Sequence, residues 1–219
     1  MNTAIILAAG NASRFKNKIP KQFKEFEGKL LIDFSINTFS KNSNINKIIL
    51  VVHKNYFDVI KKKYNNLTVV KGGKTRQESS YIGLKNCPKD TKNVLIHDAA
   101  RPFVSDRIIS DSLNELRNNV AVCPALPCTD TIAMSNDKLS IKKILKRKVL
   151  FKLQTPQSFN YKILFNCHKK NIKQVTDDIS IMMNFGYECK LIKGSNRNLK
   201  VTYDKDFKLL KILKWKKDI

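Results

Sequence analysis

The sequence predicts a single α/β domain with a doubly wound, mostly parallel, Rossmann-like sheet. Short continuous apolar runs recur along the chain, as is typical of strands buried on both faces of a parallel sheet. They lie at residues 4–8, 48–52, 67–70, 94–96 and 120–122. Stretches with helical periodicity alternate with these runs. Because alternating strands and helices fold into such sheets, and no linker or repeat interrupts residues 1–219, we expect one domain.

Three helices are predicted from the spacing of apolar residues. Residues 31–39 and 105–113 follow the helical period, and Ser105 or Asp106 can cap the second of these helices. Near the end of the chain, a further helical face consists of Phe207, Leu210, Ile212 and Leu213. Lysines oppose this face, so we expect a terminal helix that docks on the sheet.

Residues 128–150 interrupt the alternation of strands and helices. Two extended stretches, at 128–134 and 140–145, flank a turn-like segment at 135–138. This pattern predicts a hairpin that projects from the sheet domain as an arm. Because a two-stranded arm cannot bury its own face, we expect it to pack on a partner subunit.

The chain is strongly basic: 42 Lys and Arg against 18 Asp and Glu give a net charge of +24 over 219 residues. Such a field attracts polyanions such as nucleic acid, anionic lipid or phosphorylated metabolites. The lysines are dispersed rather than gathered in one tail or helix face, which favours a lysine-rich coding bias over a nucleic-acid surface. The longest apolar stretch near the start is too short to cross a bilayer and no signal peptide is evident, so we expect a cytoplasmic protein without membrane contact.

The first candidate site motif follows the first predicted strand. Residues 8–10 read Ala-Ala-Gly, and Arg14, Lys21 and Gln22 come soon after them. Small side chains let a nucleotide approach backbone N–H groups, which form an anion-binding nest. Arg14 and Lys21 would supply positive charge for phosphate oxygens. A tight strand-to-helix turn with two surface cations explains the same residues, so this motif alone leaves both interpretations open.

Two further motifs follow predicted strands. Asp98 stands at the carboxyl end of a buried strand, where it suits a hard cation such as Mg²⁺; the alternative is a carboxylate that caps the next turn. After residues 67–70, the glycines Gly72 and Gly73 would permit close approach to a base or ribose. Ser79 is expected to open the next helix, whose N–H groups and hydroxyl can bind a nucleotide, although a generic glycine loop also fits. His97 is interpreted as a packed strand residue without a catalytic role.

Three late segments, at 154–159, 176–178 and 198–202, look singly like turns and caps. Together with the earlier motifs, their order along nearly the whole chain resembles that of the 2-C-methyl-D-erythritol 4-phosphate cytidylyltransferases of non-mevalonate isoprenoid synthesis. The resemblance is carried by Ala8-Ala9-Gly10 with Arg14, Pro20-Lys21-Gln22, Gly72-Gly73 with Arg76 and Ser79, His97-Asp98-Ala99-Ala100-Arg101-Pro102, Asp130-Thr131, Thr155-Pro156-Gln157, Thr176-Asp177 and Lys200-Val201-Thr202.

The resemblance implies a fold of the nucleotide-diphospho-sugar transferase type and transfer of CMP from CTP to a polyol phosphate, with release of pyrophosphate. It implies that Arg14 and Lys21 are catalytic cations and that Asp98 faces Mg²⁺. The residues implied to bind CTP are Ala8, Ala9, Gly10, Gly73, Ser79, Asp98 and Ala99. Those implied to bind the acceptor are Thr131, Arg147, Thr176 and Lys200. Thr131 and Arg147 belong to the arm at residues 128–150, which the family exchanges in its homodimer.

The chain departs from the family pattern at three places. Ala12 stands where a glycine is usual, Lys146 replaces an acidic residue before Arg147, and Arg197 lies in a stretch that commonly holds an aspartate. The acceptor therefore remains open between 2-C-methyl-D-erythritol 4-phosphate and ribitol 5-phosphate, the substrate of sister enzymes. The sequence at 97–100 favours the former. A basic nucleic-acid-binding protein is the alternative from another functional class.

Overall fold

The centre of the computed structural model, which describes residues 1–10 and 19–215, is an eight-stranded sheet. The strand order is β10-β7-β11-β6-β1-β4-β5, and β12 also pairs with β7. The strands are β1 (Asn2–Ala8), β4 (Lys47–Val52), β5 (Thr68–Lys71), β6 (Asn93–Asp98), β7 (Ala121–Pro127), β10 (Phe151–Leu153), β11 (Gln157–Asn160) and β12 (Lys190–Lys193). All five predicted strands are present within a residue or two, apart from β7, which runs five residues further.

Most neighbouring strands in this sheet run parallel. Strand β1 is parallel to β4 and β6, with Ile5 opposite both Ile49 and Ile96. Strands β5 and β12 are parallel to their neighbours as well, whereas β10 and β11 are antiparallel. The structure thus confirms the predicted mostly parallel α/β sheet.

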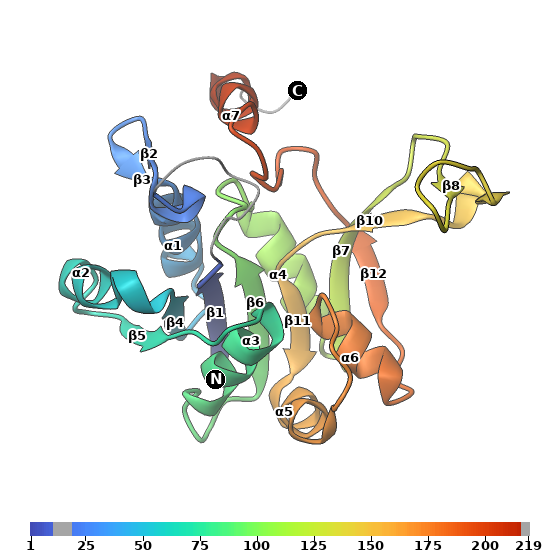
Figure 1. Ribbon diagram of the computed structural model, residues 1–219. Helices are drawn as coiled ribbons and strands as arrows, with labels where there is room; N and C mark the ends of the chain where they lie inside the picture. The colour runs from blue at the N-terminus through green and yellow to red at the C-terminus, as the bar shows by residue number, and fades with distance from the viewer. Residues whose placement is uncertain (11–18, 216–219) are drawn as a thin grey trace.

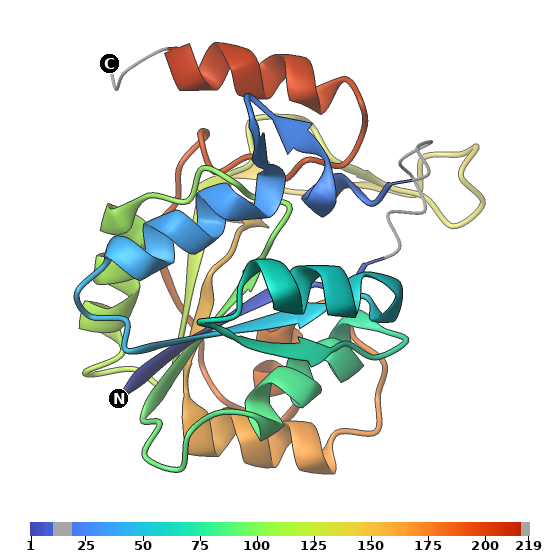
Figure 2. The same cartoon turned by 90° about the vertical axis from the view of Figure 1, so that its left-hand side faces the viewer.

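Helices cover both faces of the sheet (Figures 1 and 2). One face packs against α1 (Leu31–Lys41), α2 (Phe57–Lys63) and α4 (Asp106–Glu115), and the other packs against α3 (Arg76–Lys85), α5 (Tyr161–Lys170) and α6 (Asp178–Asn184). Successive residues of β1 point to opposite faces, so Ile6 packs with α1 and α4 whereas Ile5 packs with α3 and α5. The predicted cap is present, since the Ser105 hydroxyl accepts a hydrogen bond from Ile108 N–H at the start of α4.

The strand order reverses between β1 and β6. From β1 the chain proceeds outward through β4 and β5 and then crosses back to form β6 on the other side of β1. In open α/β sheets, ligands bind at such a reversal, beyond the carboxyl ends of the strands. This topology places the ends of β1, β5 and β6 at one edge of the sheet.

Helix α3 lies unusually close to the sheet at Gly83. A Cβ atom at this position would come within 2.5 Å of Ile5 Cγ2 and 3.2 Å of Val51 Cγ2. A Cβ contact of 2.5 Å does not occur in folded proteins and one of 3.2 Å is tight, so glycine allows this approach of the helix to β1 and β4.

The arm at residues 128–150 forms a separate two-stranded sheet of β8 (Ala133–Met134) and β9 (Lys143–Ile144), followed by a 3₁₀ turn at Arg147–Val149. It extends away from the central sheet (Figure 1). Large apolar side chains are exposed along it, among them Leu139 at 91 %, Ile141 at 70 % and Val149 at 70 %. Within a single chain, the arm therefore leaves apolar surface uncovered.

The C-terminal helix α7 (Asp206–Trp215) corrects one prediction, because it does not dock on the sheet. Leu210 is buried in a cluster with Phe26, Leu31 and Val201, beside the hairpin of β2 (Glu25–Phe26) and β3 (Lys29–Leu30). Figure 2 shows α7 lying across this hairpin. The sheet faces are already covered by the other helices, so the apolar face of α7 packs on the outside of the α1 layer.

The segment at 154–159 corrects a second prediction. Instead of a turn, residues Gln157–Asn160 form β11, which is inserted between β6 and β7. Gln157 is buried with both ends of its side-chain amide satisfied, since it donates to Asp177 and accepts from the N–H of Asp178, whereas the buried Ser158 hydroxyl has no hydrogen-bond partner among the described residues. None of the helices in residues 1–10 and 19–215 is long and apolar enough to cross a membrane.

Candidate active site

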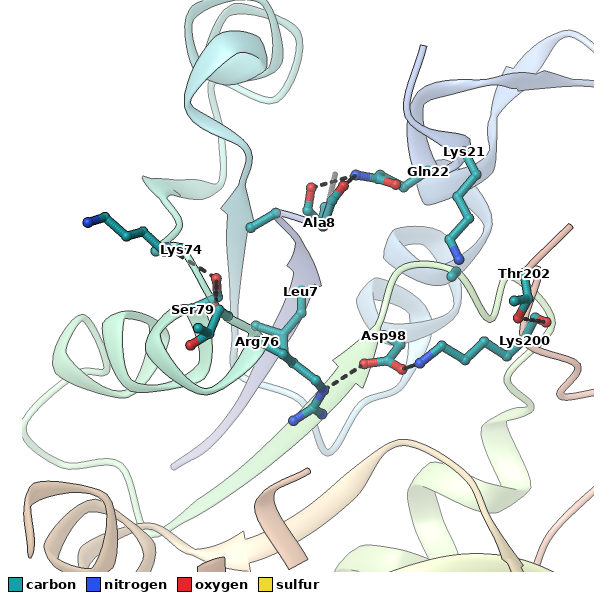
Figure 3. A pocket seen from close by; sticks show the side chains of 15 residues that line it. Leu7, Ala8, Lys21, Gln22, Lys74, Arg76, Ser79, Asp98, Lys200 and Thr202 are labelled. Carbon is teal, nitrogen blue, oxygen red and sulfur yellow. Dashed lines mark hydrogen bonds and ion pairs between the residues drawn. The ribbon is translucent and has the colours of Figure 1, made fainter. Parts of the chain in front are cut away.

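A cavity of about 310 Å³ opens where β1, β5 and β6 end (Figure 3). It is lined by Leu7, Ala8, Ala9, Gly10, Lys21, Gln22, Gly73, Lys74, Thr75, Arg76, Ser79, Asp98, Ala100, Lys200 and Thr202. Four of these side chains are cationic and only one is a carboxylate. A cavity with this charge balance suits a ligand that carries several phosphate groups.

The first loop of the cavity is held by Gln22. Its side-chain amide donates to the carbonyl oxygens of Ala8 and Gly10, over 2.9 and 3.0 Å. Gln22 follows Lys21 in a 3₁₀ turn, Lys21–Phe23, and Lys21 lines the cavity. The predicted catalytic residue Arg14 and the family departure at Ala12 lie outside the described residues.

The double-glycine loop corrects one detail of the sequence interpretation. Helix α3 begins at Arg76 and is capped by Thr75, so Ser79 lies in its first turn rather than opening it. The Ser79 hydroxyl accepts from Gly73 N–H over 3.1 Å and so holds the loop against the helix. A Cβ at Gly72 would come within 2.3 Å of Ala9 Cβ. Gly72, which does not line the cavity, therefore permits contact between the two loops, while Gly73 lines the cavity.

Asp98, the last residue of β6, lies between two cations (Figure 3). Its carboxylate accepts from Arg76 Nε over 3.2 Å and from Lys200 Nζ over 2.6 Å. Burial alone raises the pKa of this carboxyl, but the charges of Arg76 and Lys200 outweigh burial and hold the pKa well below its ordinary value. Asp98 is therefore ionised across the neutral pH range.

Arg76 has no role in the sequence interpretation beyond its place in a motif, yet it joins Asp98 to a second carboxylate. Its NH1 atom donates to Asp178 over 2.6 Å. Asp178 is fully buried and also accepts from His168 Nε2 over 2.8 Å. Burial alone raises the pKa of Asp178, but Arg76 and His168 lower it to about 2. An arginine in the first turn of a helix is unfavourable because its charge opposes the helix dipole. This unfavourable position was the feature of the sequence that could have indicated carboxylate partners for Arg76.

His97 is fully buried and does not line the cavity. The carbonyl oxygen of Arg101 can only accept, so His97 Nε2 donates to it over 3.0 Å. In the neutral ring, Nδ1 then accepts from the Thr155 hydroxyl, 3.1 Å away, and that hydroxyl also accepts from Asp98 N–H over 3.1 Å. Burial lowers the pKa of His97 to about 4, which leaves the ring neutral. These contacts are those of a packed strand residue.

The structure divides the other predicted site residues into two groups. Ala8, Ala9, Gly10, Gly73, Ser79, Asp98 and Lys200 line the cavity together with Lys21. Ala99 is buried with its N–H bonded to Leu7 O, and Ala100 takes its place in the lining. Thr131, Arg147 and Thr176 are exposed and do not line the cavity of their own chain. Arg147 instead donates to Thr129 O within the arm.

A metal at this site would have one protein carboxylate available. Among the described residues, no three His, Cys, Asp or Glu side chains gather in a group that could hold a metal ion. Mg²⁺ commonly binds one or two carboxylates together with substrate phosphates and water. Asp98 fits this donor set only when a phosphorylated ligand shares the ion.

Comparison with known proteins agrees with this geometry. The model of the family described as "2-C-methyl-D-erythritol 4-phosphate cytidylyltransferase" matches residues 2–213. An enzyme of that name from Clostridium novyi is 40 % identical over 215 residues, which cover 94 % of this chain and 93 % of the relative. A bifunctional IspD/IspF enzyme from Pelagibacter ubique is 40 % identical over 214 residues, 96 % of this chain, and the chain spans only 57 % of that relative.

Solved structures are similar over the same range. The crystal structure of 4-diphosphocytidyl-2C-methyl-D-erythritol synthase from Anaerococcus prevotii has a TM-score of 0.83 and 30 % identity, with 95 % of this chain and 93 % of that one covered. The bifunctional IspDF from Campylobacter jejuni has a TM-score of 0.83 and 28 % identity, with 94 % and 53 % covered. The family match, the curated relatives and the shared fold agree, and the chain belongs to the 2-C-methyl-D-erythritol 4-phosphate cytidylyltransferase family.

Proposed function

We propose that the protein transfers the CMP moiety of CTP to 2-C-methyl-D-erythritol 4-phosphate, giving 4-diphosphocytidyl-2-C-methyl-D-erythritol and pyrophosphate. The observation that carries this proposal is the cavity at the β1–β6 reversal, whose lining includes four cationic side chains, Lys21, Lys74, Arg76 and Lys200, and the single carboxylate of Asp98. The family and the curated relatives are named for this reaction.

The attacking group in this reaction needs no general base. A phosphate monoester has a second pKa of about 6, so the acceptor phosphate is already a dianion near neutral pH. One of its oxygens forms a bond to the α-phosphorus of CTP, and the bond from that phosphorus to the oxygen of the departing pyrophosphate breaks. The buried, neutral ring of His97 is consistent with a mechanism that moves no proton at this step.

The main barrier is electrostatic, because a dianion approaches a triphosphate and charge grows on the departing pyrophosphate. Fixed cations stabilise this charge without reorganising during the reaction. We assign Lys21, with Arg14, to the charge of the transition state, and Lys200 to the acceptor phosphate. The half-exposed side chain of Lys200 can leave Asp98 for a phosphate that enters the cavity.

We further propose that Asp98 holds Mg²⁺ together with phosphate oxygens of the bound nucleotide. The ion would supply further positive charge to the phosphates. Asp98 is ionised and projects into the cavity, as this role requires.

A homodimer with exchanged arms is proposed on separate grounds. Thr131 and Arg147, the arm residues implied to bind the acceptor, do not line the cavity of their own chain. The arm also exposes Leu139, Ile141 and Val149. A second copy of the chain would cover this apolar surface and receive both polar residues at its own cavity.

Pyrophosphate release from CTP and Mg²⁺ tests the proposed activity. Separate assays would contain 2-C-methyl-D-erythritol 4-phosphate, ribitol 5-phosphate or no acceptor. We expect release with the first acceptor only, and Lys21→Ala protein serves as the matched negative control. Release with ribitol 5-phosphate alone would overturn the acceptor and leave the reaction class, whereas no release with either would overturn the reaction class.

A further inference from the structure

Arg76 joins two carboxylates that are far apart in the sequence. Its Nε donates to Asp98 over 3.2 Å and its NH1 donates to Asp178 over 2.6 Å. Asp98 ends β6, Arg76 begins α3 and Asp178 begins α6. One guanidinium therefore connects the ends of three elements beside the nucleotide cavity. Only arginine has two donors in a rigid planar group that can reach both carboxylates at once.

The position of Arg76 is not explained by the stability of its own helix. A cation in the first turn lies at the positive end of the helix dipole, which is unfavourable. Its side chain is only 24 % exposed, so solvent does not fully compensate its charge. The two carboxylates provide this compensation, and burying a charge so close to a cavity requires such pairing.

Asp178 is the fixed end of this connection. One carboxylate oxygen accepts from Ser80 Oγ over 2.6 Å and from His168 Nε2 over 2.8 Å, which leaves the other oxygen for Arg76. Its N–H donates to Gln157 Oε1 over 3.0 Å. The side chain is fully buried and cannot rotate without breaking several hydrogen bonds.

Lys200, the other cation that contacts Asp98, is held less firmly than Arg76. Its side chain is 40 % exposed, and its ammonium group donates to the Asp98 carboxylate over 2.6 Å. When a phosphate draws Lys200 away, Arg76 stays on Asp98 because Asp178 holds it. The carboxylate then keeps its orientation during the exchange.

We propose that Asp178 is a positioning residue for the transfer reaction, which holds Arg76 and, through Arg76, fixes the carboxylate of Asp98. This inference rests on the proposed function. A second contact links the same segment to α3, since the N–H of Val175 donates to Gln77 Oε1 over 3.1 Å. A shift of Asp178 would therefore displace the end of α3 that carries Arg76.

Two variants and two matched controls test this inference. Asp178→Asn removes the charge that holds Arg76, and Arg76→Lys keeps a cation but replaces the planar guanidinium, which contacts the two carboxylates through different nitrogens, with a single ammonium group. Asp111→Asn and Arg107→Lys make the same changes in an exposed Asp–Arg pair on α4. We expect each test variant to lower kcat about ten- to hundredfold, because small displacements of catalytic groups have effects of this size. The controls should stay within about twofold of the wild type.

The double variant separates positioning from a purely structural role. If Asp178 acts through Arg76, the double variant Asp178→Asn with Arg76→Lys should have about the same kcat as the less active of the two single variants. If the two residues acted independently, the fold-decreases in kcat of the single variants would multiply. The kinetics are measured well below the melting temperature of each variant. A lower melting temperature with unchanged kcat per folded molecule would overturn the inference, as would multiplicative losses.

The remaining outcomes are also decisive. If Asp178→Asn does not fold, Arg76→Lys carries the test alone, and kcat within twofold of the wild type overturns the inference. Wild-type protein that is inactive with both polyol phosphates rejects the proposed function instead. CTP affinity, measured by calorimetry without acceptor, then tests the positioning: about tenfold weaker binding in Arg76→Lys than in Arg107→Lys supports it, and equal binding overturns it.

Discussion

The side-chain amide of Gln22 donates to the carbonyl oxygen of Ala8 over 2.9 Å, and the same nitrogen reaches Gly10 O. Gln22 is only 3 % exposed, so these bonds form out of contact with most of the solvent. They engage two oxygens whose partial negative charge would otherwise oppose an anion in the adjacent cavity. Because Lys21 precedes Gln22, the same contact also fixes the turn that presents this lysine.

Replacing Gln22 with Met should weaken CTP binding about tenfold, since two main-chain oxygens lose their donor. Isothermal titration calorimetry with CTP measures this effect directly. Gln174→Met, at an exposed position, is the matched control and should bind CTP like the wild type. Unchanged affinity in a folded Gln22→Met protein would show that the loop keeps its shape without this contact.

Lys21→Ala should lower kcat about a hundredfold and change the KM for CTP much less, because the lysine acts mainly on charge that develops in the transition state. Steady-state pyrophosphate release at varied CTP gives both constants. Lys89→Ala removes an exposed lysine and controls for the change in net charge. A large KM effect with normal kcat would assign Lys21 to ground-state binding.

His97→Gln should remain active and should change how stability depends on pH. Burial lowers the pKa of His97 to about 4, against an ordinary value near 6.5. Between these values the unfolded chain binds a proton that the folded chain does not, so stability is lost as pH falls from 6.5 to 4. The loss amounts to about 3 kcal/mol, from the linkage relation and the size of the pKa shift.

Urea unfolding at pH 7, 5.5 and 4.5 measures this dependence. His97→Gln should lose less stability than the wild type between pH 7 and 4.5. Below about pH 4 both proteins should still lose stability, because the pKa values of Asp98 and Asp178 are lowered in the folded state of each. Equal slopes for the two proteins would contradict a neutral buried ring. A folded but inactive His97→Gln protein would contradict the mechanism.

Mixing two inactive chains tests the exchanged arms. Lys21→Ala damages the cavity of its own chain, and in the proposed dimer Arg147→Ala damages only the arm that would reach the partner's cavity. In an equal mixture with complete subunit exchange, about a quarter of the sites combine an intact cavity with an intact arm. Pyrophosphate release should therefore return to about a quarter of the wild-type rate. No recovery after verified exchange would place Arg147 in its own chain's site or outside any site.

Local sequence patterns predicted the central strands and the residues of the first loop. Each of these features depends on a few neighbouring residues, such as an apolar run or small residues at the end of a strand. The continuous apolar run of β6 predicted a doubly buried strand, and Asp98 at its end was a candidate site residue because packing explains an aspartate there poorly. The topology then brought Ala8, Gly73 and Asp98 to one cavity, as expected for carboxyl ends of parallel strands.

Features that depend on distant partners were not predictable in this way. Arg76 and Asp178 are 102 residues apart, and neither neighbourhood shows that the two side chains meet. Strand β11 was missed because Gln157 is polar, and its burial is possible only through contacts with Asp177 and Asp178. The docking of α7 depended on which surfaces were still uncovered, which the periodicity of the helix does not reveal.

The missing side chain at Gly83 has a consequence for how variants of this protein should be read. Gly83 sits two turns along α3 from Arg76 and never touches the cavity, yet it sets how closely the whole helix approaches β1 and β4. Any larger residue would lift α3, and the end of the helix that carries Arg76 and Ser79 would move with it. In a mutational scan, substitutions at position 83 would thus lower activity as substitutions of a substrate-contacting residue do. The cause would be a larger distance between α3 and the sheet.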